Sequence, residues 1–385
     1  MANTNNNKSL NVPILRFPEF TGEWRQDLME NVTERIGDGI HSTPTYNEYG
    51  DYFFINGNNL VDGKIKIFNN TQKVTKEEAL KQNANVLCDN SLLLSINGTI
   101  GNVAIYNNER IMLGKSACYI NPSAKILRDF LFFYLQNSKI QKYFILELTG
   151  STIKNLSLTS IKNTKLRLPS IQEQAKIAKL LRAIDERIAT QNKIIGDLKK
   201  LKSAIYQEIF SNLQGEECSL SDLAEIIKGQ QINGSELSDS GKYYVMNGGI
   251  APSGYYDSYN TEADTISISE GGNSCGYVQY NSSEFWSGGH CYTLRIKPTS
   301  SMTTQFLFHY LKWKEPDIMA LRIGSGLPNI QKKDLSKISI IVPTLDKQLQ
   351  LTVLFSAFKK KIENEEMYVA NLDKQKQYLL QQMFI

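Results

Sequence analysis

Two long stretches of the chain carry apolar residues at a regular seven-residue spacing. Residues 172–210 and 346–384 contain no proline, and Pro169 and Pro343 stand just before them, where the entry of a helix tolerates proline. Each stretch has two interleaved rows of this spacing, which is typical of a coiled coil rather than of a surface helix. The rows are Ile184, Gln191, Leu198, Ile205 and Ile188, Ile195, Lys202, Ile209 in the first stretch, and Phe358, Glu365, Leu372, Leu379 and Ile362, Val369, Lys376, Met383 in the second.

Polar residues interrupt these rows at corresponding places. Gln191 and Glu365 interrupt one row, and Lys202 and Lys376 interrupt the other. A polar residue in the seam between two helices lowers stability and can fix the register. The alternative is that these residues mark the solvent edge of the apolar stripe, and the sequence leaves both interpretations open. Two such helices in one chain are expected to pack on each other in antiparallel orientation.

The long helices belong to a larger internal repeat. A shift of 174 residues places Pro169 over Pro343 and aligns 169–210 with 343–384 without a gap, with ten identical positions. The match continues upstream, where 130–135 (FLFFYL) corresponds to 306–311 (FLFHYL), Cys118-Tyr119 to Cys291-Tyr292 and Asn56-Gly57 to Asn247-Gly248. Because the similarity extends beyond the helices, chance likeness of helical sequence does not explain it. One unit, a globular segment followed by a long helix, occurs twice.

The globular segments are expected to be mixed α/β. Short β-type runs lie between clusters of Asn, Gly and Ser, at Tyr52–Asn56, Ser91–Ile96, Val103–Tyr106, Tyr243–Met246, Thr265–Ser269 and Tyr277–Tyr280. Each segment ends in an amphipathic helix, at Asp129–Lys142 and Thr304–Trp313. We therefore predict an α+β fold with these parts: a disordered arm at 1–12, a first head at 13–168, a central helix at 169–212, a second head at 213–342 and a C-terminal helix at 343–385.

Composition limits the possible functions. The 385 residues are 21% charged and 10% aromatic, which indicates a folded chain. The net charge of +4 is a weak signal for nucleic-acid binding, so such a function must rest on local features or on partners. Five cysteines without C-x-x-C spacing and three histidines disfavour a disulfide framework or a metal site. Without an 18-residue apolar run or a signal peptide, we expect a soluble cytoplasmic protein with no membrane partner.

The loops of both heads carry side chains with which proteins contact DNA. Asn and Gln bond adenine, Arg and Lys bond guanine, and Ser, Thr and backbone amides bind phosphates. Taken singly, each residue has the alternative role of a turn former or a solvated side chain. The candidates are Asp38, Gly39, His41, Thr43, Asn56, Asn58, Asn97, Thr99 and Lys115 in the first head, and Gln230, Gln231, Asn247, Tyr255, Tyr256, Asn273 and His290 in the second.

Two Gly-Ser pairs occupy equivalent places in the repeat, Gly150-Ser151 and Gly324-Ser325. Glycine allows a close approach of the backbone and serine donates a hydrogen bond, which together suit a clamp for a DNA phosphate. The alternative is a tight turn before the last strand of each head. Both interpretations remain open at this point.

Several motifs resemble the target-recognition domain of type I restriction–modification specificity subunits. They are GDGIHSTP at 37–44, Phe54-Ile55-Asn56, NGTIG at 97–101, the opening Val12-Pro13-x-Leu15-Arg16-Phe17, and the helix openings Pro169/Gln174 and Pro343/Gln348. The resemblance covers essentially the whole chain, in the order recognition domain, helix, recognition domain, helix. The second head has Lys228-Gly229-Gln230-Gln231 where the first has Asp-Gly-x-His, so it is expected to recognise a different half-site.

The resemblance implies a non-catalytic subunit that binds double-stranded DNA at a bipartite target. Each head would recognise one half-site, with a non-specific spacer between them. Two methyltransferase subunits would dock on the chain and methylate an adenine in each half-site from S-adenosylmethionine. Restriction subunits would add translocation and cleavage driven by ATP and Mg. These cofactors are expected on the partner subunits and not on this chain.

Two other functions are weighed against this one. The first is a stand-alone DNA-modifying enzyme with fused specificity domains. It is disfavoured because Asn121-Pro122-Ser123 is not the Asn-Pro-Pro-aromatic motif of a methyltransferase, and the chain has no G-x-x-x-x-G-K-[ST] loop. The second is a coiled-coil scaffold whose two heads bind nucleic acid or protein, which the small net charge keeps open. The sequence does not identify the target bases or the spacer length.

Overall fold

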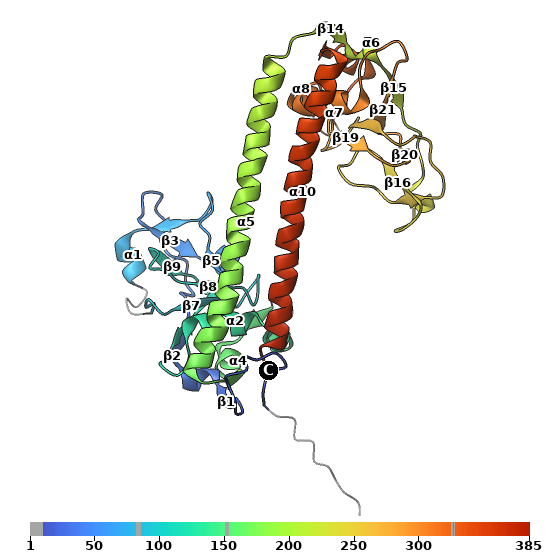
Figure 1. Ribbon diagram of the computed structural model, residues 1–385. Coiled ribbons are helices and arrows are strands. Elements are labelled where there is room, and N and C mark those ends of the chain that lie inside the picture. The colour runs from blue at the N-terminus through green and yellow to red at the C-terminus, as the bar shows by residue number, and fades with distance from the viewer. Residues whose placement is uncertain (1–10, 82–85, 151–153, 325, 327) are drawn as a thin grey trace, which may run out of the picture. The chain divides into compact units, whose positions relative to one another are not determined.

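The computed structural model describes residues 11–81, 86–150, 154–324, 326 and 328–385, and the chain forms two compact units. Unit 1 is Met1–Gln191 with Tyr368–Ile385, and unit 2 is Asn192–Met367. The long helices α5 (Ile171–Ser211) and α10 (Leu345–Gln382) both run through the two units (Figure 1). Each unit therefore contains one head and part of each long helix.

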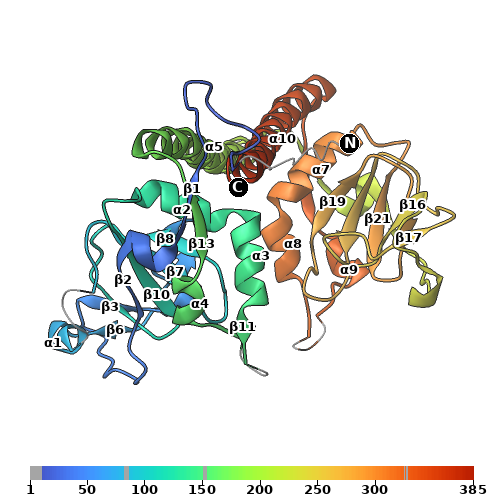
Figure 2. The same ribbon diagram turned by 90° about the horizontal axis from the view of Figure 1, so that it is seen from below.

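The first head is built on a four-stranded antiparallel sheet in the order β2–β10–β7–β8 (Figure 2). Side chains alternate between its faces. Leu94 and Cys118 belong to the core shared with the helices, whereas Leu93 and Tyr119 pack in a second cluster with Ile55. The strands are β2 (Thr33–Asp38), β7 (Leu92–Ser95), β8 (Val103–Ile105) and β10 (Ala117–Pro122), and the helices that follow are α2 (Arg128–Gln136) and α3 (Ser138–Leu146).

Smaller elements surround this sheet. A three-stranded sheet has β3 between β6 and β9, with β3 and β9 parallel. These elements are β3 (Tyr52–Ile55), β6 (Lys73–Val74), β9 (Ile111–Leu113), β1 (Arg25–Leu28) with β13 (Lys165–Leu168), β4 (Leu60–Val61) with β5 (Lys64–Ile65), β11 (Leu148–Thr149) with β12 (Asn155–Leu156), α1 (Lys76–Leu80), α4 (Leu158–Lys162), η1 (Met29–Val32) and η2 (Gly57–Asn59).

The second head repeats this topology, so the predicted internal repeat is confirmed. Its four-stranded sheet has the order β15–β21–β18–β19, and β16 pairs in parallel with β20 as β3 does with β9. The elements are β15 (Ala224–Lys228), β16 (Tyr243–Met246), β17 (Tyr255–Tyr256), β18 (Thr265–Ser269), β19 (Val278–Asn281), β20 (Trp286–Ser287), β21 (Cys291–Ile296), α7 (Thr304–Trp313), α8 (Glu315–Ala320), α9 (Lys332–Leu335), η3 (Gly234–Glu236), α6 (Leu220–Leu223), and β14 (Glu216–Ser219) with β22 (Ser339–Val342).

Strand register corrects one detail of the sequence repeat. The sequence comparison aligned Cys118 with Cys291, but Cys118 pairs with Asp38 and Tyr292 pairs with Lys228 at the ends of the equivalent strands β2 and β15. Cys118 is therefore equivalent to Tyr292. A slip of one residue moves a side chain to the opposite face of a sheet. Accordingly, both Cys118 and Tyr292 belong to the core that faces the helices, and Cys291 does not.

The helix predicted at Asp129–Lys142 is also corrected, because it is two helices that meet at Asn137. Asn137 has an extended backbone conformation, and its side chain caps α3 by accepting a hydrogen bond from Lys139 N. Its amide also donates to Leu380 O of α10. A buried contact with a distant segment thus stabilises a break that the apolar periodicity of 129–142 did not reveal.

The long helices pack antiparallel within each unit, as predicted. In unit 1 the beginning of α5 and the end of α10 contribute Leu181 and Leu380 to one core. In unit 2 the end of α5 and the beginning of α10 meet at Tyr206 and Phe355, whose ring centroids are 4.1 Å apart. Every residue of the predicted heptad rows is buried or half-buried. No described helix is long and apolar enough to cross a bilayer.

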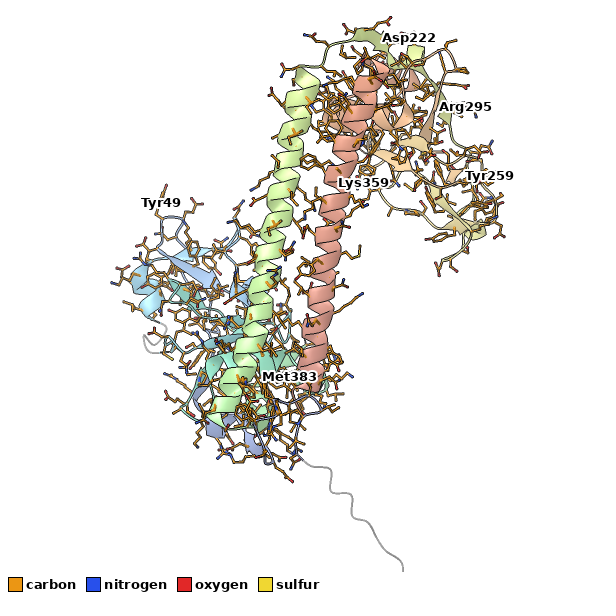
Figure 3. All side chains as sticks on the ribbon, in the orientation of Figure 1. Tyr49, Asp222, Tyr259, Arg295, Lys359 and Met383 are labelled. Carbon is orange, nitrogen blue, oxygen red and sulfur yellow. The ribbon has the colours of Figure 1, made fainter. Side chains whose placement is uncertain are left out.

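Each core is completed by the end of the helix that follows the other head. Phe384 packs in unit 1 with ring centroids 5.4 Å from Phe130 and 5.3 Å from Tyr134, next to Met383 (Figure 3). Phe210 contacts Phe306 and Tyr310 in the same manner in unit 2. The N-terminal segment joins this arrangement in unit 1, because Leu15 N donates to Gln382 O. Residues 1–10 of the predicted arm lie outside the described residues.

Candidate nucleic-acid interface

Three polar segments of the first head meet at one edge of its sheet. They follow the ends of β2, β3 and β7, and they meet the turn that precedes β10. Ser116 connects them: its hydroxyl donates to Asn56 Oδ1 (2.8 Å) and accepts from Gly57 N (2.9 Å), and its carbonyl accepts from Ile96 N (3.0 Å). The structure therefore brings Asn56 together with the segment of Asn97 and with Lys115, which is exposed beside Ser116.

His41 is the most exposed basic group at the end of β2. Its Nε2 lies 2.8 Å from Asp38 Oδ2, and 73% of its side chain is exposed. Thr43 is also exposed, two residues further along. Gly39 is instead a structural requirement, because it donates to Ala117 O and a Cβ there would lie 2.1 Å from Leu113 O.

The loop after β7 lies beside two further candidates. Gly98 has a φ of 74°, and a Cβ on it would be 3.5 Å from Asn58 Oδ1, so these two exposed loops are neighbours. The hydroxyl of Thr99 lies 3.1 Å from Ser95 Oγ. Asn97 pairs with Asn155, which pairs with Thr149 on its other side, so Gly150 (φ 94°) follows a strand that lies near this loop. Ser151 lies outside the described residues, so of the proposed phosphate clamp the structure describes only Gly150.

Equivalent segments of the second head also meet at one edge of its sheet, but they carry different residues. Gln230 N donates to Ser287 O (2.8 Å), and Gln231 follows it, exposed. His290 N donates to Asn247 Oδ1 (3.1 Å), which joins the end of β16 to the turn before β21. Asn273 is exposed in the loop after β18, whose Gly272 N donates to Pro328 O (3.0 Å). Gly324 (φ 106°) is near this loop through the pairing of Ile323 with Asn329 and of Asn329 with Gly271, and Ser325 lies outside the described residues.

Tyr255 and Tyr256 are not brought to the end of β16 with the other candidates. They form β17 and pair with Tyr244 and Tyr243, at the beginning of β16. Tyr256 retains an indirect link, because its ring packs edge-on against Trp286 (5.1 Å), whose Nε1 donates to Gln230 O. Both tyrosines are half-buried.

Sequence reasoning missed a charged group in the second head. Lys228 Nζ donates to Glu270 Oε1 at 2.7 Å, and Tyr292 donates to the same oxygen at 2.9 Å. Burial, together with the hydrogen bond to Glu270, raises the pKa of Tyr292, so the phenol remains a donor. Lys228 also lines a groove of about 360 Å³ with Gln230 and Arg295. The only sequence signal was that Lys228 is aligned with Asp38.

Comparisons with known proteins agree with this architecture. The sequence profile of the family described as type I restriction modification DNA specificity domain matches the chain twice, over residues 31–200 and 214–371. A putative type I specificity subunit of Mycoplasma pneumoniae is 33% identical over 147 residues, which is 38% of this chain and 39% of the relative. A putative type I restriction enzyme specificity subunit of Methanocaldococcus jannaschii is 23% identical over an alignment of 402 positions, covering 94% of this chain and 93% of the relative.

The fold is shared with a solved structure. The S subunit of a type I restriction-modification system from M. genitalium superposes with a TM-score of 0.63 at 19% identity, over 97% of this chain and 99% of that one. At this level of identity the likeness concerns the fold. The matches to the Mycoplasma pneumoniae relative and to a putative type I specificity subunit of Mycoplasma genitalium span only about two fifths of the length of each relative, 39% and 40%.

Proposed function

The chain belongs to the type I restriction–modification DNA specificity family, and on this premise we propose that it is the subunit that recognises the DNA target. It binds double-stranded DNA through two heads, residues 13–168 and 213–342, and each head recognises one half-site of a bipartite sequence. The chain has no catalytic role of its own. Methyltransferase and restriction subunits, with S-adenosylmethionine, ATP and Mg as their cofactors, carry out the reactions where this chain directs them.

One observation carries the proposal. In each head, polar loops that follow equivalent strands meet at the same edge of equivalent sheets, around Asn56 and Ser116 in one and Asn247 and His290 in the other. The framework and one asparagine (Asn56 and Asn247) are shared by the heads, whereas Asp38 and Ser116 of the first edge are replaced by Lys228 and His290 in the second. A scaffold that merely joined two partners would not require this pattern, whereas recognition of two different half-sites does.

The proposed DNA-contacting residues are candidates at these edges whose side chains are exposed or half-buried. In the first head they are Asp38, His41, Thr43, Asn56, Asn58, Asn97, Thr99 and Lys115, and the proposal also includes Gly150 and Ser151, its neighbour in the sequence. In the second head they are Gln230, Gln231, Asn247, Asn273 and His290, and the proposal also includes Gly324 and Ser325, its neighbour in the sequence. The small net charge of +4 implies that partner subunits supply much of the attraction to phosphates.

The experiment that tests the function is a methylome. The chain is expressed with its partner methyltransferase subunit in a host that lacks adenine methylation. We expect a single bipartite motif with one methylated adenine in each half-site, and no methylation when either protein is omitted. Methylation by the partner alone at the same motif would show that this chain does not determine the target.

The repeat also predicts the stoichiometry of the complex. Two equivalent units should offer two equivalent docking surfaces, so one chain should bind two methyltransferase subunits. Light scattering of the reconstituted complex measures this directly. A complex that contains one methyltransferase per chain, with the methyltransferase in excess, would contradict the prediction.

A further inference from the structure

Four equivalent positions at the recognition edge differ between the heads as a group. Strand register and backbone hydrogen bonds place Lys228, Glu270, His290 and Tyr292 where the first head has Asp38, Ile96, Ser116 and Cys118. The backbone around them is the same, since Glu270 N donates to His290 O (2.9 Å) as Ile96 N does to Ser116 O (3.0 Å). Two apolar core positions of the first head, Ile96 and Cys118, are thus replaced by a carboxylate and a phenol.

The centre of this cluster is the buried carboxylate of Glu270, which is only 8% exposed. Its backbone is held on both sides, because Ile330 N also donates to Glu270 O (2.9 Å). Oε1 accepts from Lys228 Nζ and from the hydroxyl of Tyr292. A buried carboxylate is strongly destabilising unless donors surround it, so Lys228 and Tyr292 are required for the cluster to exist.

The second carboxylate oxygen points to His290. Among the described residues, Glu270 Oε2 is buried without a hydrogen-bond partner, and His290 Nδ1 is 3.9 Å away. A buried acceptor without a donor is unfavourable, and a small movement of the largely exposed imidazole would supply the donor. DNA that orders His290 against this edge would therefore gain the energy of the missing hydrogen bond.

Lys228 is in a position to contact a base. Its side chain is 56% exposed, and one of the three N–H donors of the ammonium is directed to Glu270. The neighbouring carboxylate repels a phosphate, but it does not oppose a neutral base edge that offers hydrogen-bond acceptors. Guanine presents two such acceptors, O6 and N7, in the major groove.

We propose that Lys228 donates to a guanine of the half-site recognised by the second head, and that Glu270 is the positioning residue that fixes Lys228 and His290 at the edge. This inference rests on the proposed function, because it assigns the chemistry of one recognition site. It adds Lys228 and Glu270 to the residues that determine specificity, and it makes Tyr292 part of their support.

The test compares Lys228→Gln and Glu270→Gln with the unmodified chain, each expressed with the methyltransferase partner and assayed by methylome sequencing. Lys337→Ala is the matched control. Lys337 is an exposed lysine of the same head, and it follows α9 and not β15, at whose end Lys228 lies. Lys228→Gln should reduce the preference for guanine at one position of one half-site by roughly 5- to 150-fold. The other half-site and the control should be unchanged.

Glu270→Gln distinguishes positioning from a merely structural role. It retains the shape and an acceptor for Tyr292, but it leaves the ammonium of Lys228 without its counter-charge. We expect the same loss of guanine preference, together with tighter binding to non-target DNA and a steeper dependence of that binding on salt, by about one unit of slope. A structural role would lower thermal stability and weaken binding to all DNA.

Three outcomes would overturn the inference. The first is an unchanged motif in Lys228→Gln. The second is a uniform loss of methylation across sequences with a shallower salt dependence, which would make Lys228 a phosphate contact. The third is an effect on both half-sites together with unfolding of Glu270→Gln. If the unmodified chain directs no bipartite methylation at all, the proposed function itself is wrong. This result comes from the unmodified chain alone, so it is distinguishable from a failure of the inference about Lys228 and Glu270.

Discussion

Two buried glutamines make the same three hydrogen bonds in the two units. Gln174 Oε1 accepts from Leu127 N (2.9 Å), and its amide donates to Lys125 O and Pro169 O. Gln348 does the same with Thr303 N (2.8 Å), Ser301 O and Pro343 O. Each amide joins the first turn of a long helix to the segment that enters α2 or α7. The Pro-x-x-x-x-Gln motif is therefore structural, and its side chains do not reach the recognition edge.

A buried polar pair, in contrast, is found in only one of the two units. His309 Nδ1 lies 2.7 Å from the hydroxyl of Tyr206 in the core of unit 2. The repeat places Phe133 and Leu380 at these positions in unit 1, so two apolar residues of the core occupy them there. Burial, with further contributions from Lys202 and Lys359, lowers the pKa of His309 to about 4.

This depressed pKa predicts a loss of stability in acid. Since the folded pKa lies below the ordinary value of 6.5, the unfolded chain binds the proton more readily, so stability is full above pH 6.5 and falls as the pH drops toward 4. Between pH 7 and 5 the free energy of unfolding should fall by about 2 kcal/mol through this group. Urea unfolding at both pH values measures it.

The double variant His309→Phe with Tyr206→Leu is the control, because it installs the apolar pair of unit 1. It should lose the acid dependence attributed to His309 while it remains folded. His309→Phe alone should be less stable at pH 7, since it leaves the buried hydroxyl of Tyr206 unpaired, at a cost of roughly 1–3 kcal/mol. Equal acid dependence in the native chain and the double variant would show that the pKa of His309 does not differ between the folded and the unfolded chain.

His41 provides the residue-scale test of the recognition edge. The imidazole is exposed and contacts Asp38, so its removal should not affect folding. We expect His41→Ala to weaken methylation of the target by roughly 5- to 150-fold, the worth of one specific base contact. Glu34→Gln, an exposed change near the beginning of the same strand, should have no effect. Lost folding or lost assembly with the partner would instead make His41 structural.

At the scale of elements, a half-buried ion pair joins α5 to α10 in unit 1. Lys376 Nζ lies 2.7 Å from Asp185 Oδ1 and also donates to Gln136, and only 15% of the Lys376 side chain is exposed. The polar interruption of the heptad row at Lys376 is therefore inside the packed seam and not at its solvent edge. In unit 2, Lys202 is equivalent to Lys376, and Lys359 stands at the position equivalent to Asp185. Burial, together with nearby lysines that include Lys359, lowers the pKa of Lys202.

Removal of this carboxylate should destabilise the helix pair. We expect Asp185→Ala to lower the free energy of unfolding by about 1–2 kcal/mol, because it leaves a half-buried ammonium unpaired. The matched control is Glu366→Ala, which breaks the exposed pair of Lys199 and Glu366 (2.7 Å) and should cost about 0–1 kcal/mol. Equal losses in the two variants, measured by chemical denaturation, would mean that the Lys376 pair has no special role.

At the scale of the whole molecule, two heads with one framework predict independent recognition. Replacing residues 20–150 with the equivalent segment of another family member should change one half of the methylated motif and leave the other unchanged. The graft must retain aromatic residues at the positions of Phe130 and Tyr134, because Phe384, which follows α10, packs against both rings. Methylome sequencing measures both halves at once. A change in both halves would show that the heads are not autonomous.

The sequence by itself determined the periodic and repeated features of this protein. Seven-residue spacing predicted the long helices, and every residue of the rows, from Ile184 to Met383, is buried or half-buried. The gapless alignment of Pro169 with Pro343 predicted two copies of one unit, which share a strand order. These features are encoded by neighbouring residues or by comparison of one copy with the other, so no knowledge of distant contacts was needed.

Tertiary structure alone decided the register and the polar networks. The alignment of Cys118 with Cys291 was wrong by one residue, because hydrogen bonds to β2 and β15 fix the register of β10 and β21. The break at Asn137 depends on a contact with α10. Likewise, Lys228, Glu270 and Tyr292 come from three different strands, and nothing local to Glu270 shows that its carboxylate is buried between two donors. Such groups are brought together by packing, and each gains its chemistry from partners that lie far away in the sequence.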